Sequence, residues 1–238
     1  MIKTISRKFY RFKTSKNYLK FIRIFHDWFG EKFREEIELP KFYDDTIHRK
    51  EIINEIIRLK DFKYYLEIGC DQNELFSKVN IKKKIGVDPN SGGTHKMTSD
   101  VFFKNNNDVF DLIFIDGLHI YDQVKKDILN SLEVLSEKGF ILLHDCFPLK
   151  YLDQAVPRAQ KHWNGDVWRA ILECRTYDNI NTFVGAFDNG VGLIFKKKNE
   201  NQLKMHSNEL NNVSFDDYCK NYKNFLNLID YDEFFKII

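Results

Sequence analysis

The sequence has no long hydrophobic run. No stretch approaches the roughly 18 apolar residues that a membrane-spanning helix requires, and the basic start, MIKTISRKFYRF, lacks the apolar segment that would follow in a secretion signal. The four cysteines, Cys70, Cys146, Cys174 and Cys219, form no C-x-x-C pair, so their spacing favours neither a zinc knuckle nor a disulfide framework. We therefore expect a cytoplasmic protein whose thiols are reduced.

Acidic residues are missing from the first 26 positions, although the whole chain has 35 acidic and 37 basic residues. Eight basic side chains are interleaved there with apolar ones. An anionic glycan, a nucleotide, a lipid surface or a nucleic acid could bind such a segment. The simpler interpretation is a solvated helical face that covers the core. The basic residues are Lys3, Arg7, Lys8, Arg11, Lys13, Lys16, Lys20 and Arg23.

The rest of the composition is typical of a globular protein. Of the 238 residues, 43% are hydrophobic and 30% are charged, whereas a disordered chain would contain far fewer apolar residues. This length suits one α/β domain with terminal additions. Helical spacing gives way to strand-like runs at Tyr64. We predict a helical N-terminal cap at residues 1–60, a core at residues 61–198 and a helical C-terminal tail at residues 199–238, together one compact domain.

Four short apolar runs, YYLEIG, KIGVD, DLIFID and FILLHD, each end in Gly or an acidic residue. Parallel strands buried on both faces form continuous apolar runs, and polar residues collect where such strands feed loops. The pattern predicts a doubly wound α/β sheet with a ligand at its carboxyl edge. Apolar spacing predicts a crossover helix from Tyr121 to Ser136, ended by Gly139. The Asp-Asn-Gly sequence at 188–190, between two later apolar runs, predicts a closing antiparallel hairpin.

Two of the strand ends suit a nucleoside. Gly69 lies where the backbone must approach a ligand, and Asp88 ends the next strand, where a carboxylate can accept both hydroxyls of a ribose. Either residue alone could merely end a strand. The chain has no G-x-G-x-x-G run to cradle a pyrophosphate at a helix N-terminus. We therefore expect a nucleoside ligand without a pyrophosphate.

The ordered motifs YLEIGC, GVDPN, SDVFF, IDGLHIYDQVKKDI, GFILLHDC, NGDVWRAI and GVGLI resemble class I methyltransferases of the group related to sugar and macrolide O-methyltransferases. The resemblance covers about residues 64–195 and is most specific in IDGLHxYxxVxxDI followed by GFILLHD. It implies a seven-stranded, mostly parallel sheet of the Rossmann-like methyltransferase type. It also implies that residues 61–198 bind S-adenosylmethionine across the strand ends.

The resemblance further implies which residues bind the cofactor. The family's glycine-rich turn is reduced here to the sequence GCDQN at residues 69–73, so the departure falls at the methionine end of the cofactor. The implied residues, from the methionine part through the ribose to the adenine, are Glu67, Gly69, Asp116, Asp88, Ser99 and Asp100.

Two later strand ends would face the transferable methyl group. A hydroxyl must lose its proton as it attacks this methyl, and a histidine of near-neutral pKa suits that step, so His119 is the candidate base. The order of these polar residues along the chain resembles that in catechol-type O-methyltransferases, in which a strand-end Asp and a later Asp-Asn pair hold magnesium. Asp116 and Asp145 match, but Cys146 replaces the Asn, and a thiol is a poor magnesium ligand.

These considerations give two overlapping sets. Asp116, His119 and Asp145 are the predicted catalytic residues, and Asp116, Asp145 and His144 are the predicted ligands of a divalent metal, magnesium or manganese. The alternatives are a His119 that only orients its loop and a His144 that is a hydrogen-bonded strand-end residue.

The sequence WNGDVWR at residues 163–169 lies where acceptor loops usually occur. Its two indoles and its Arg could stack on a sugar ring and hold an anionic group, although core packing of Trp168 is an equal alternative. Asp166 ranks below His119 as a base. We predict S-adenosylmethionine-dependent O-methylation of a hydroxyl on a sugar, a sugar nucleotide or a surface-glycan unit, with an anionic acceptor.

Two other functions remain open from the sequence. A nucleic-acid methyltransferase would explain the basic N-terminus, but the chain has no N/D-P-P-Y/F-like motif for a flipped base, so we expect no stable nucleic-acid partner. A non-catalytic adenosylmethionine- or nucleotide-binding module is favoured by the reduced glycine turn and disfavoured by Asp116, His119 and Asp145. A homo-oligomer is also compatible with the sequence.

Overall fold

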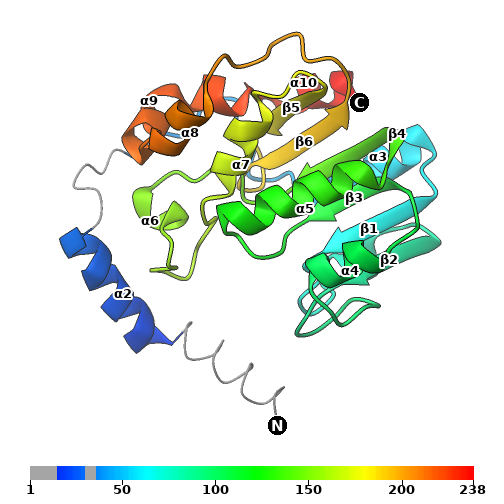
Figure 1. Ribbon diagram of the computed structural model, residues 1–238, viewed down its shortest axis with the longest axis horizontal. Helices are drawn as coiled ribbons and strands as arrows, with labels where there is room; N and C mark the ends of the chain where they lie inside the picture. The colour runs from blue at the N-terminus through cyan, green and yellow to red at the C-terminus, as the bar shows by residue number, and fades with distance from the viewer. Residues whose placement is uncertain (1–14, 30–35) are drawn as a thin grey trace.

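One seven-stranded sheet forms the centre of the computed structural model, which describes residues 15–29 and 36–238 (Figure 1). The strand order is β2-β1-β3-β4-β6-β5-β7, in which β2, β1, β3 and β4 are parallel and β6 is antiparallel to both of its neighbours. This confirms the predicted doubly wound, mostly parallel sheet. The strands are β1 (Tyr64–Ile68), β2 (Lys83–Val87), β3 (Phe110–Ile115), β4 (Leu135–Leu143), β5 (Ile180–Gly185), β6 (Val191–Lys196) and β7 (Leu228–Ile229).

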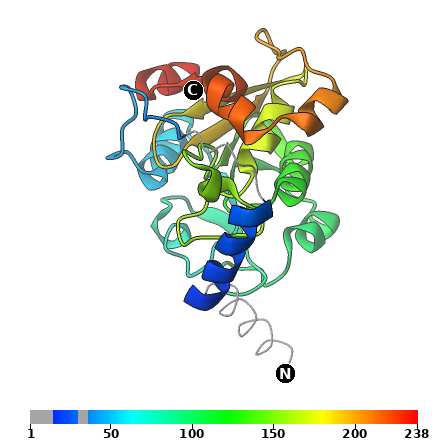
Figure 2. The same cartoon turned by 90° about the vertical axis from the view of Figure 1, so that its left-hand side faces the viewer.

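Helices cover both faces of the sheet (Figures 1 and 2). Alternate strand residues point to opposite faces, so Leu66 of β1 packs in one apolar cluster and Tyr65 in another. Burial on both faces explains why β1 is a continuous apolar run. The first cluster includes residues of α4 (Ser99–Asn105), α5 (Tyr121–Glu133), α7 (Val167–Cys174) and α9 (Phe215–Leu226), and the second includes residues of α3 (Arg49–Lys60), the short helix η1 (Phe76–Lys78) and α10 (Tyr231–Ile237).

The predicted antiparallel hairpin is present. β5 and β6 pair from Gly185 and Val191 outward, and the intervening turn contains Asp188, Asn189 and Gly190 with φ values of 43°, 59° and 87°. Asp, Asn and Gly tolerate this left-handed backbone better than other residues do, which explains why this sequence forms the turn.

The crossover helix is shorter than predicted. α5 begins at Tyr121 as expected but ends at Glu133, and β4 begins at Leu135. Gly139 therefore lies within β4 and does not end the helix. A Cβ at Gly139 would lie 2.7 Å from Asp111 O, so the glycine allows two strands to approach closely where the β3–β4 register shifts.

Segments from both ends of the chain pack on this sheet domain. α2 (Lys16–Phe29) contacts the region around α6 (Tyr151–Gln154), while residues 1–14 and 30–35 of the predicted N-terminal cap lie outside the described residues. The predicted helical tail contains α8 (Ser207–Asn212), α9 and α10, but it also supplies β7, which pairs with β5 at the sheet edge.

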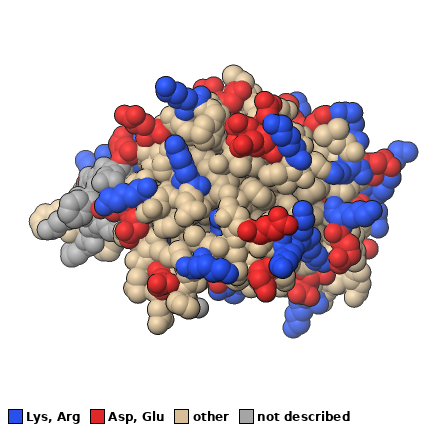
Figure 3. Space-filling model, turned by 90° about the horizontal axis from the view of Figure 1, so that it is seen from above, with Lys and Arg blue, Asp and Glu red and all other residues tan. Residues whose placement is uncertain are grey.

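The distribution of charged side chains on the surface agrees with the nearly balanced composition of acidic and basic residues. On the face seen in Figure 3, basic and acidic side chains are interspersed, as the chain's net charge of +2 suggests. Among the described residues, no helix is both long enough and apolar enough to cross a membrane.

Candidate active site

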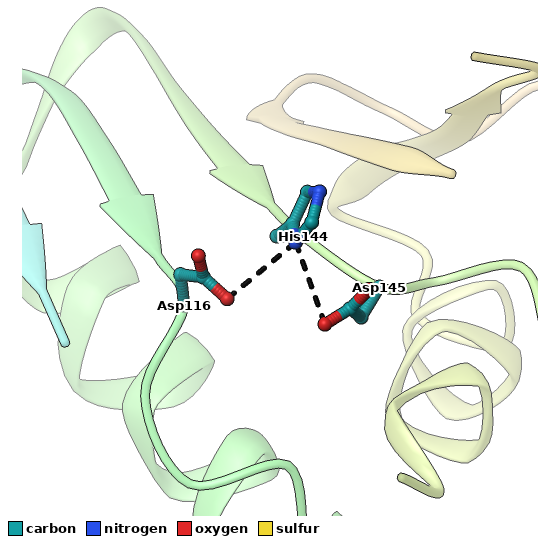
Figure 4. Close-up of side chains that lie close together, drawn as sticks. All are labelled: Asp116, His144 and Asp145. Atoms are coloured by element: carbon teal, nitrogen blue, oxygen red, sulfur yellow. Dashed lines mark ion pairs between the residues drawn. The ribbon is translucent and has the colours of Figure 1, made fainter. Parts of the chain in front are cut away.

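Two neighbouring strands end in acidic residues at the carboxyl edge of the sheet. β3 is followed by Asp116 and β4 by His144 and Asp145, and the His144 N–H donates to Ile115 O at 3.1 Å. The three side chains converge, as Figure 4 shows, because the carboxyl ends of parallel strands meet at one edge. Nδ1 of His144 lies 3.5 Å from Asp116 Oδ1 and 3.4 Å from Asp145 Oδ2.

His119 bridges the same two carboxylates from the loop between β3 and α5. Its Nε2 lies 3.1 Å from Asp116 Oδ1, and its Nδ1 lies 3.2 Å from Asp145 Oδ2 and 3.3 Å from Trp163 O. Since a carbonyl oxygen only accepts hydrogen bonds, Nδ1 carries a proton, and Nε2 is the nitrogen that can be unprotonated. The structure thus brings together all four residues predicted for catalysis or metal binding. We call Asp116, His119, His144 and Asp145 the strand-end cluster.

Two charged residues that the sequence analysis did not single out complete the surroundings of His144. Arg49 Nη1 lies 3.1 Å from His144 Nε2 and 3.2 Å from Asp188 Oδ2, while Asp188 Oδ1 lies 3.4 Å from His144 Nε2. Asp188 also accepts the backbone N–H of Arg49 at 2.6 Å, so the hairpin turn caps the start of α3. The sequence features that could have indicated these contacts are an acidic residue in a tight turn, Asp188, and an arginine at the start of a helix, Arg49.

The charges of these residues depend on one another. Burial disfavours the charged form of Asp116, but His144 and His119 outweigh it and hold the pKa of Asp116 well below its usual range. Burial also opposes protonation of both histidines, but the neighbouring carboxylates outweigh it and raise the pKa values of His119 and His144. Burial raises the pKa of Asp188, yet His144 and Arg49 lower it overall to about 2. The surrounding charges therefore stabilise the ionised forms of Asp116 and Asp188 and the protonated forms of both histidines, relative to the same groups buried alone.

The residues of the predicted acceptor motif at 163–169 lie in different environments, and only some of them are next to the strand-end cluster. Trp163 stacks on His119 with ring centroids 5.5 Å apart. Trp168 is fully buried and donates from its indole N–H to Gln154 Oε1 at 3.3 Å, so core packing is the correct alternative for this residue. Asp166 Oδ1 accepts the backbone N–H of Tyr121 at 2.6 Å and thereby fixes the start of α5.

The structure also explains the Asp145-Cys146 pair, which stands where the catechol-type pattern has Asp-Asn. Cys146 is fully buried, with its Sγ 3.7 Å from Leu143 O and 3.6 Å from His144 O, so its thiol contacts the backbone of β4. An amide is nevertheless present beside the cluster, because Asn164 Nδ2 donates to Asp145 Oδ1 at 3.3 Å. Asn164 is buried, and its Oδ1 has no hydrogen-bond partner among the residues that the structure describes.

The turn after β1 keeps a strained backbone without the expected glycines. Gly69 has φ 90°, and a Cβ there would lie 2.1 Å from Asp116 O, so only glycine fits. Asp71 and Asn73 adopt positive φ values of 42° and 65°. Because Asp and Asn are the non-glycine residues that best tolerate this region, they replace the missing glycines of the turn.

The predicted ribose ligand, Asp88, is bonded mainly to backbone. Its Oδ1 accepts the N–H groups of Asn90 at 2.7 Å and Ser91 at 2.9 Å, and its Oδ2 accepts that of Asp71 at 3.0 Å. The carboxylate therefore ties together the loops that follow β1 and β2. A carboxylate has about four lone-pair positions, so capacity for a further donor remains.

The other residues predicted to bind the cofactor occupy two further places. Ser99 and Asp100 begin α4, and both accept from Gln123 Nε2 of α5 at 3.2 Å. Glu67 is buried in β1 and accepts the hydroxyl of Tyr65 at 2.6 Å. Burial raises the pKa of Glu67 to about 7.

Comparisons with known proteins agree with this architecture. Residues 65–146 match the model of a methyltransferase domain family. No curated protein sequence matches the chain.

Solved structures share the fold at low identity. A methyltransferase of Podospora anserina bound to S-adenosylhomocysteine is 18% identical with a TM-score of 0.50, over 63% of this chain and 78% of that one. A protein of Staphylococcus aureus described as a caffeoyl-CoA O-methyltransferase is 15% identical with a TM-score of 0.48, over 82% of this chain and 98% of that one. The domain match and the first of these likenesses confirm the class I methyltransferase resemblance and its Rossmann-like fold.

Proposed function

We propose that this class I S-adenosylmethionine-dependent methyltransferase methylates a hydroxyl group of a sugar, a sugar nucleotide or a surface-glycan unit. The observation that carries the proposal is the position of His119 between the carboxylates of Asp116 and Asp145, at 3.1 and 3.2 Å. A hydroxyl nucleophile needs a base within hydrogen-bond reach, and a half-buried histidine oriented by contacts at both nitrogens suits that role. Because the cofactor's methyl is already activated, positioning supplies much of the catalysis.

His119 would take up the proton at Nε2. In neutral His119, Nδ1–H is directed to Trp163 O and Asp145, which leaves Nε2 as the acceptor. When bound, S-adenosylmethionine would supply the methyl group from its S–CH3 bond and would leave as S-adenosylhomocysteine, while the hydroxyl proton would move to Nε2 of His119. Asp116 then accepts a hydrogen bond from the new Nε2–H and stabilises the imidazolium.

Arg49 and Asp188 are proposed as positioning residues for His144. Arg49 and Asp188 contact Nε2 of His144, and Asp116 and Asp145 contact Nδ1, so polar contacts at both ring nitrogens fix the ring plane. Arg49 adds positive charge that keeps Asp188 ionised. A fixed His144 keeps the two strand-end carboxylates apart at the spacing that His119 spans.

The strand-end cluster also fits a divalent cation. One ligand atom from each of Asp116, His144 and Asp145 lies within 4.8 Å of the others, and the buried Asn164 Oδ1 beside Asp145 lacks a partner among the described residues. Carboxylate and amide oxygens are the ligands that hard cations prefer. Asp116, Asp145 and His144 would hold magnesium or manganese, which would lower the pKa of the acceptor hydroxyl.

The cofactor is proposed to lie over the ends of β2, β1 and β3. The sheet order makes Asp88, Gly69 and Asp116 the residues at three adjacent strand ends. The remaining capacity of the Asp88 carboxylate supports a ribose hydroxyl as its ligand. Because Gly69 has no side chain, the backbone of the turn after β1 approaches Asp116 closely, and we assign this backbone to the methionine part of the cofactor. Glu67 is assigned to the methionine part, and Ser99 and Asp100 are assigned to the adenine because they begin α4 next to this edge.

Aromatic and cationic groups near His119 support a carbohydrate acceptor. Trp163 is half-buried and stacks on His119, and the Arg158 guanidinium lies 5.5 Å from the centre of the Trp163 ring. Indole rings stack on the apolar faces of sugars, and Arg binds phosphate or carboxylate groups. Arg49 adds a second cation beside the cluster. An anionic sugar derivative therefore matches these side chains.

The test is methyl transfer from labelled S-adenosylmethionine to a panel of sugar nucleotides and glycan units, with His119→Ala and the matched variant His162→Ala. His162 has a 56% exposed side chain outside the cluster, so its variant should keep full activity. Product in the wild type and in His162→Ala, with little in His119→Ala, would support the proposal. Absence of calorimetric binding of S-adenosylmethionine and S-adenosylhomocysteine at millimolar concentration would overturn it.

A further inference from the structure

Helix α2 has two apolar faces, and one of them packs on the loop after α6. Ile22 is 8% exposed and clusters with Ala155 and Ala159. His26, also buried, donates from Nε2 to Pro157 O at 2.9 Å. The side of α2 that carries these two residues therefore fixes the helix on the loop after α6 (Figure 2).

The other apolar face of α2 is exposed. Phe21 is 67% exposed, Ile24 48%, Phe25 46% and Trp28 77%, and their spacing of three, four and seven residues places them on one stripe. Burying large aromatic side chains is strongly favourable, so such a stripe on a solvent-exposed surface indicates an interaction site. We call these four residues the α2 stripe.

Basic residues border the α2 stripe. Lys16, Lys20 and Arg23 follow one another at spacings of four and three along the helix, and Asp27 is the single acid in the sequence of α2. Residues 1–14, which lie outside the described part of the chain, add five basic residues and no acid in sequence. The face of the molecule in Figure 3 differs, because basic and acidic side chains are interspersed there.

We propose that α2 binds an anionic lipid bilayer surface, lying flat with the α2 stripe among the acyl chains and the basic edge at the headgroups. A helix of 14 residues is about 21 Å long, too short to cross a hydrocarbon core of about 30 Å. Trp and Phe on one face and Lys and Arg on the next are typical of helices that lie in the membrane interface.

Charge favours a bilayer over a second copy of the chain. A symmetric contact between two α2 stripes would bring the two basic edges into one interface, where they repel each other. An anionic headgroup layer attracts the same edge, and each basic residue near such a surface raises binding roughly fivefold. The proposal does not depend on methyl transfer.

Membrane binding would also place the acceptor loop near the bilayer. Trp163 donates from its indole N–H to Ala155 O at 2.7 Å, and Ala155 packs against Ile22 of α2. The same Trp163 stacks on His119. Three contacts, from Ile22 to Ala155, from Ala155 to Trp163 and from Trp163 to His119, therefore link α2 to the strand-end cluster, and a lipid-bound glycan would reach this side of the enzyme directly.

The test is sedimentation of the full chain with vesicles of phosphatidylcholine alone and of phosphatidylcholine with about one third phosphatidylglycerol. The wild type should bind the anionic vesicles and leave the neutral ones largely unbound. Phe21→Ser/Trp28→Ser and Lys20→Glu/Arg23→Glu should each lower the partition coefficient about tenfold or more. The matched control Lys197→Glu/Lys198→Glu, with the same charge change at exposed residues after β6, should bind as the wild type does.

Three results would overturn the proposal. The first is no binding of the wild type to anionic vesicles at low salt. The second is binding that the charge variant loses and the Phe21→Ser/Trp28→Ser variant keeps, which indicates a polyanion such as nucleic acid as the ligand. The third is a dimer in lipid-free solution that Trp28→Ser dissociates. Circular dichroism of each variant confirms the fold, and Trp28→Phe should retain binding while it loses fluorescence quenching by brominated lipid.

Discussion

The strand-end cluster and the β1–β2 loops lie at the same edge of one sheet, yet their polar groups are satisfied in different ways. In the cluster, side chains contact side chains, as when His119 spans Asp116 and Asp145. At the β1–β2 loops, side chains mainly contact backbone, as when Asp88 accepts three backbone N–H groups. Changes in the cluster should therefore alter chemistry with little effect on shape, whereas changes in the loops should alter both cofactor affinity and local stability.

Replacing His119 should have the largest effect. His119→Ala should lower turnover about 10²- to 10⁴-fold, the usual loss when a general base is removed. The affinity for S-adenosylmethionine should change little, because the contacts of His119 are with Asp116, Asp145 and Trp163. Turnover and calorimetric affinity measured together check this prediction. An equal loss of cofactor affinity in His119→Ala would contradict the proposed difference between the strand-end cluster and the β1–β2 loops.

Removing Asp145 separates the roles of metal and histidine. If a divalent cation is required, a chelator should lower wild-type turnover by about 10²-fold or more and should have little further effect on Asp145→Ala. Asp178→Ala, at an exposed aspartate outside the cluster, should respond to the chelator as the wild type does. Full activity of both His119→Ala and Asp145→Ala would exclude the cluster from the mechanism and leave Asp166 as the next candidate.

A change at Asp88 tests the loop side of the comparison. Asp88→Ala should weaken cofactor binding by about 1 to 3 kcal/mol, the scale of hydrogen bonds to a charged group. Loss of its three backbone contacts should also lower the melting temperature, while turnover at saturating cofactor stays within a few-fold. Calorimetry and thermal unfolding give the two quantities. Unchanged affinity with lowered stability would make Asp88 a structural residue only.

The smallest expected effect is a pH dependence of stability at Glu67. Burial raises the pKa of this acid from 4.5 to about 7, so the stability from its neutral form is present below pH 4.5 and is lost as the pH rises through 7. Relative to Glu67→Gln, the wild type should lose about 1 to 3 kcal/mol of unfolding free energy over this range. Glu74→Gln, at an exposed glutamate, should leave the pH dependence unchanged. Denaturant unfolding at several pH values measures the difference.

The sequence predicted those features that depend on short stretches of chain. Continuous apolar runs identified β1 to β4 because these strands are buried on both faces. The convergence of Asp116 and Asp145 followed because parallel strands end at one edge. The end of α5 was predicted wrongly, since Gly139 resembles a helix terminator although it serves the close approach of β3 and β4.

Features that depend on tertiary packing could not be predicted. Arg49 and Asp188 are 139 residues apart, and neither has a local pattern that indicates a shared contact with His144. Asn164 likewise reaches Asp145 only because the loop before α7 folds against β4. The backbone roles of Asp71 and Asn73 were hidden because the family pattern uses glycine at such turns.

The strand β7 has a consequence for the chain's solubility. Ala186 N–H, just after β5, donates to Ile229 O at 2.9 Å, and Asn227 Nδ2 donates to Thr182 O at 3.2 Å, so the C-terminal segment covers one side of β5. An uncovered edge strand offers its backbone groups to other chains and promotes aggregation. A chain shortened before Asn227 should therefore precipitate or associate through β5 even where its remaining residues fold.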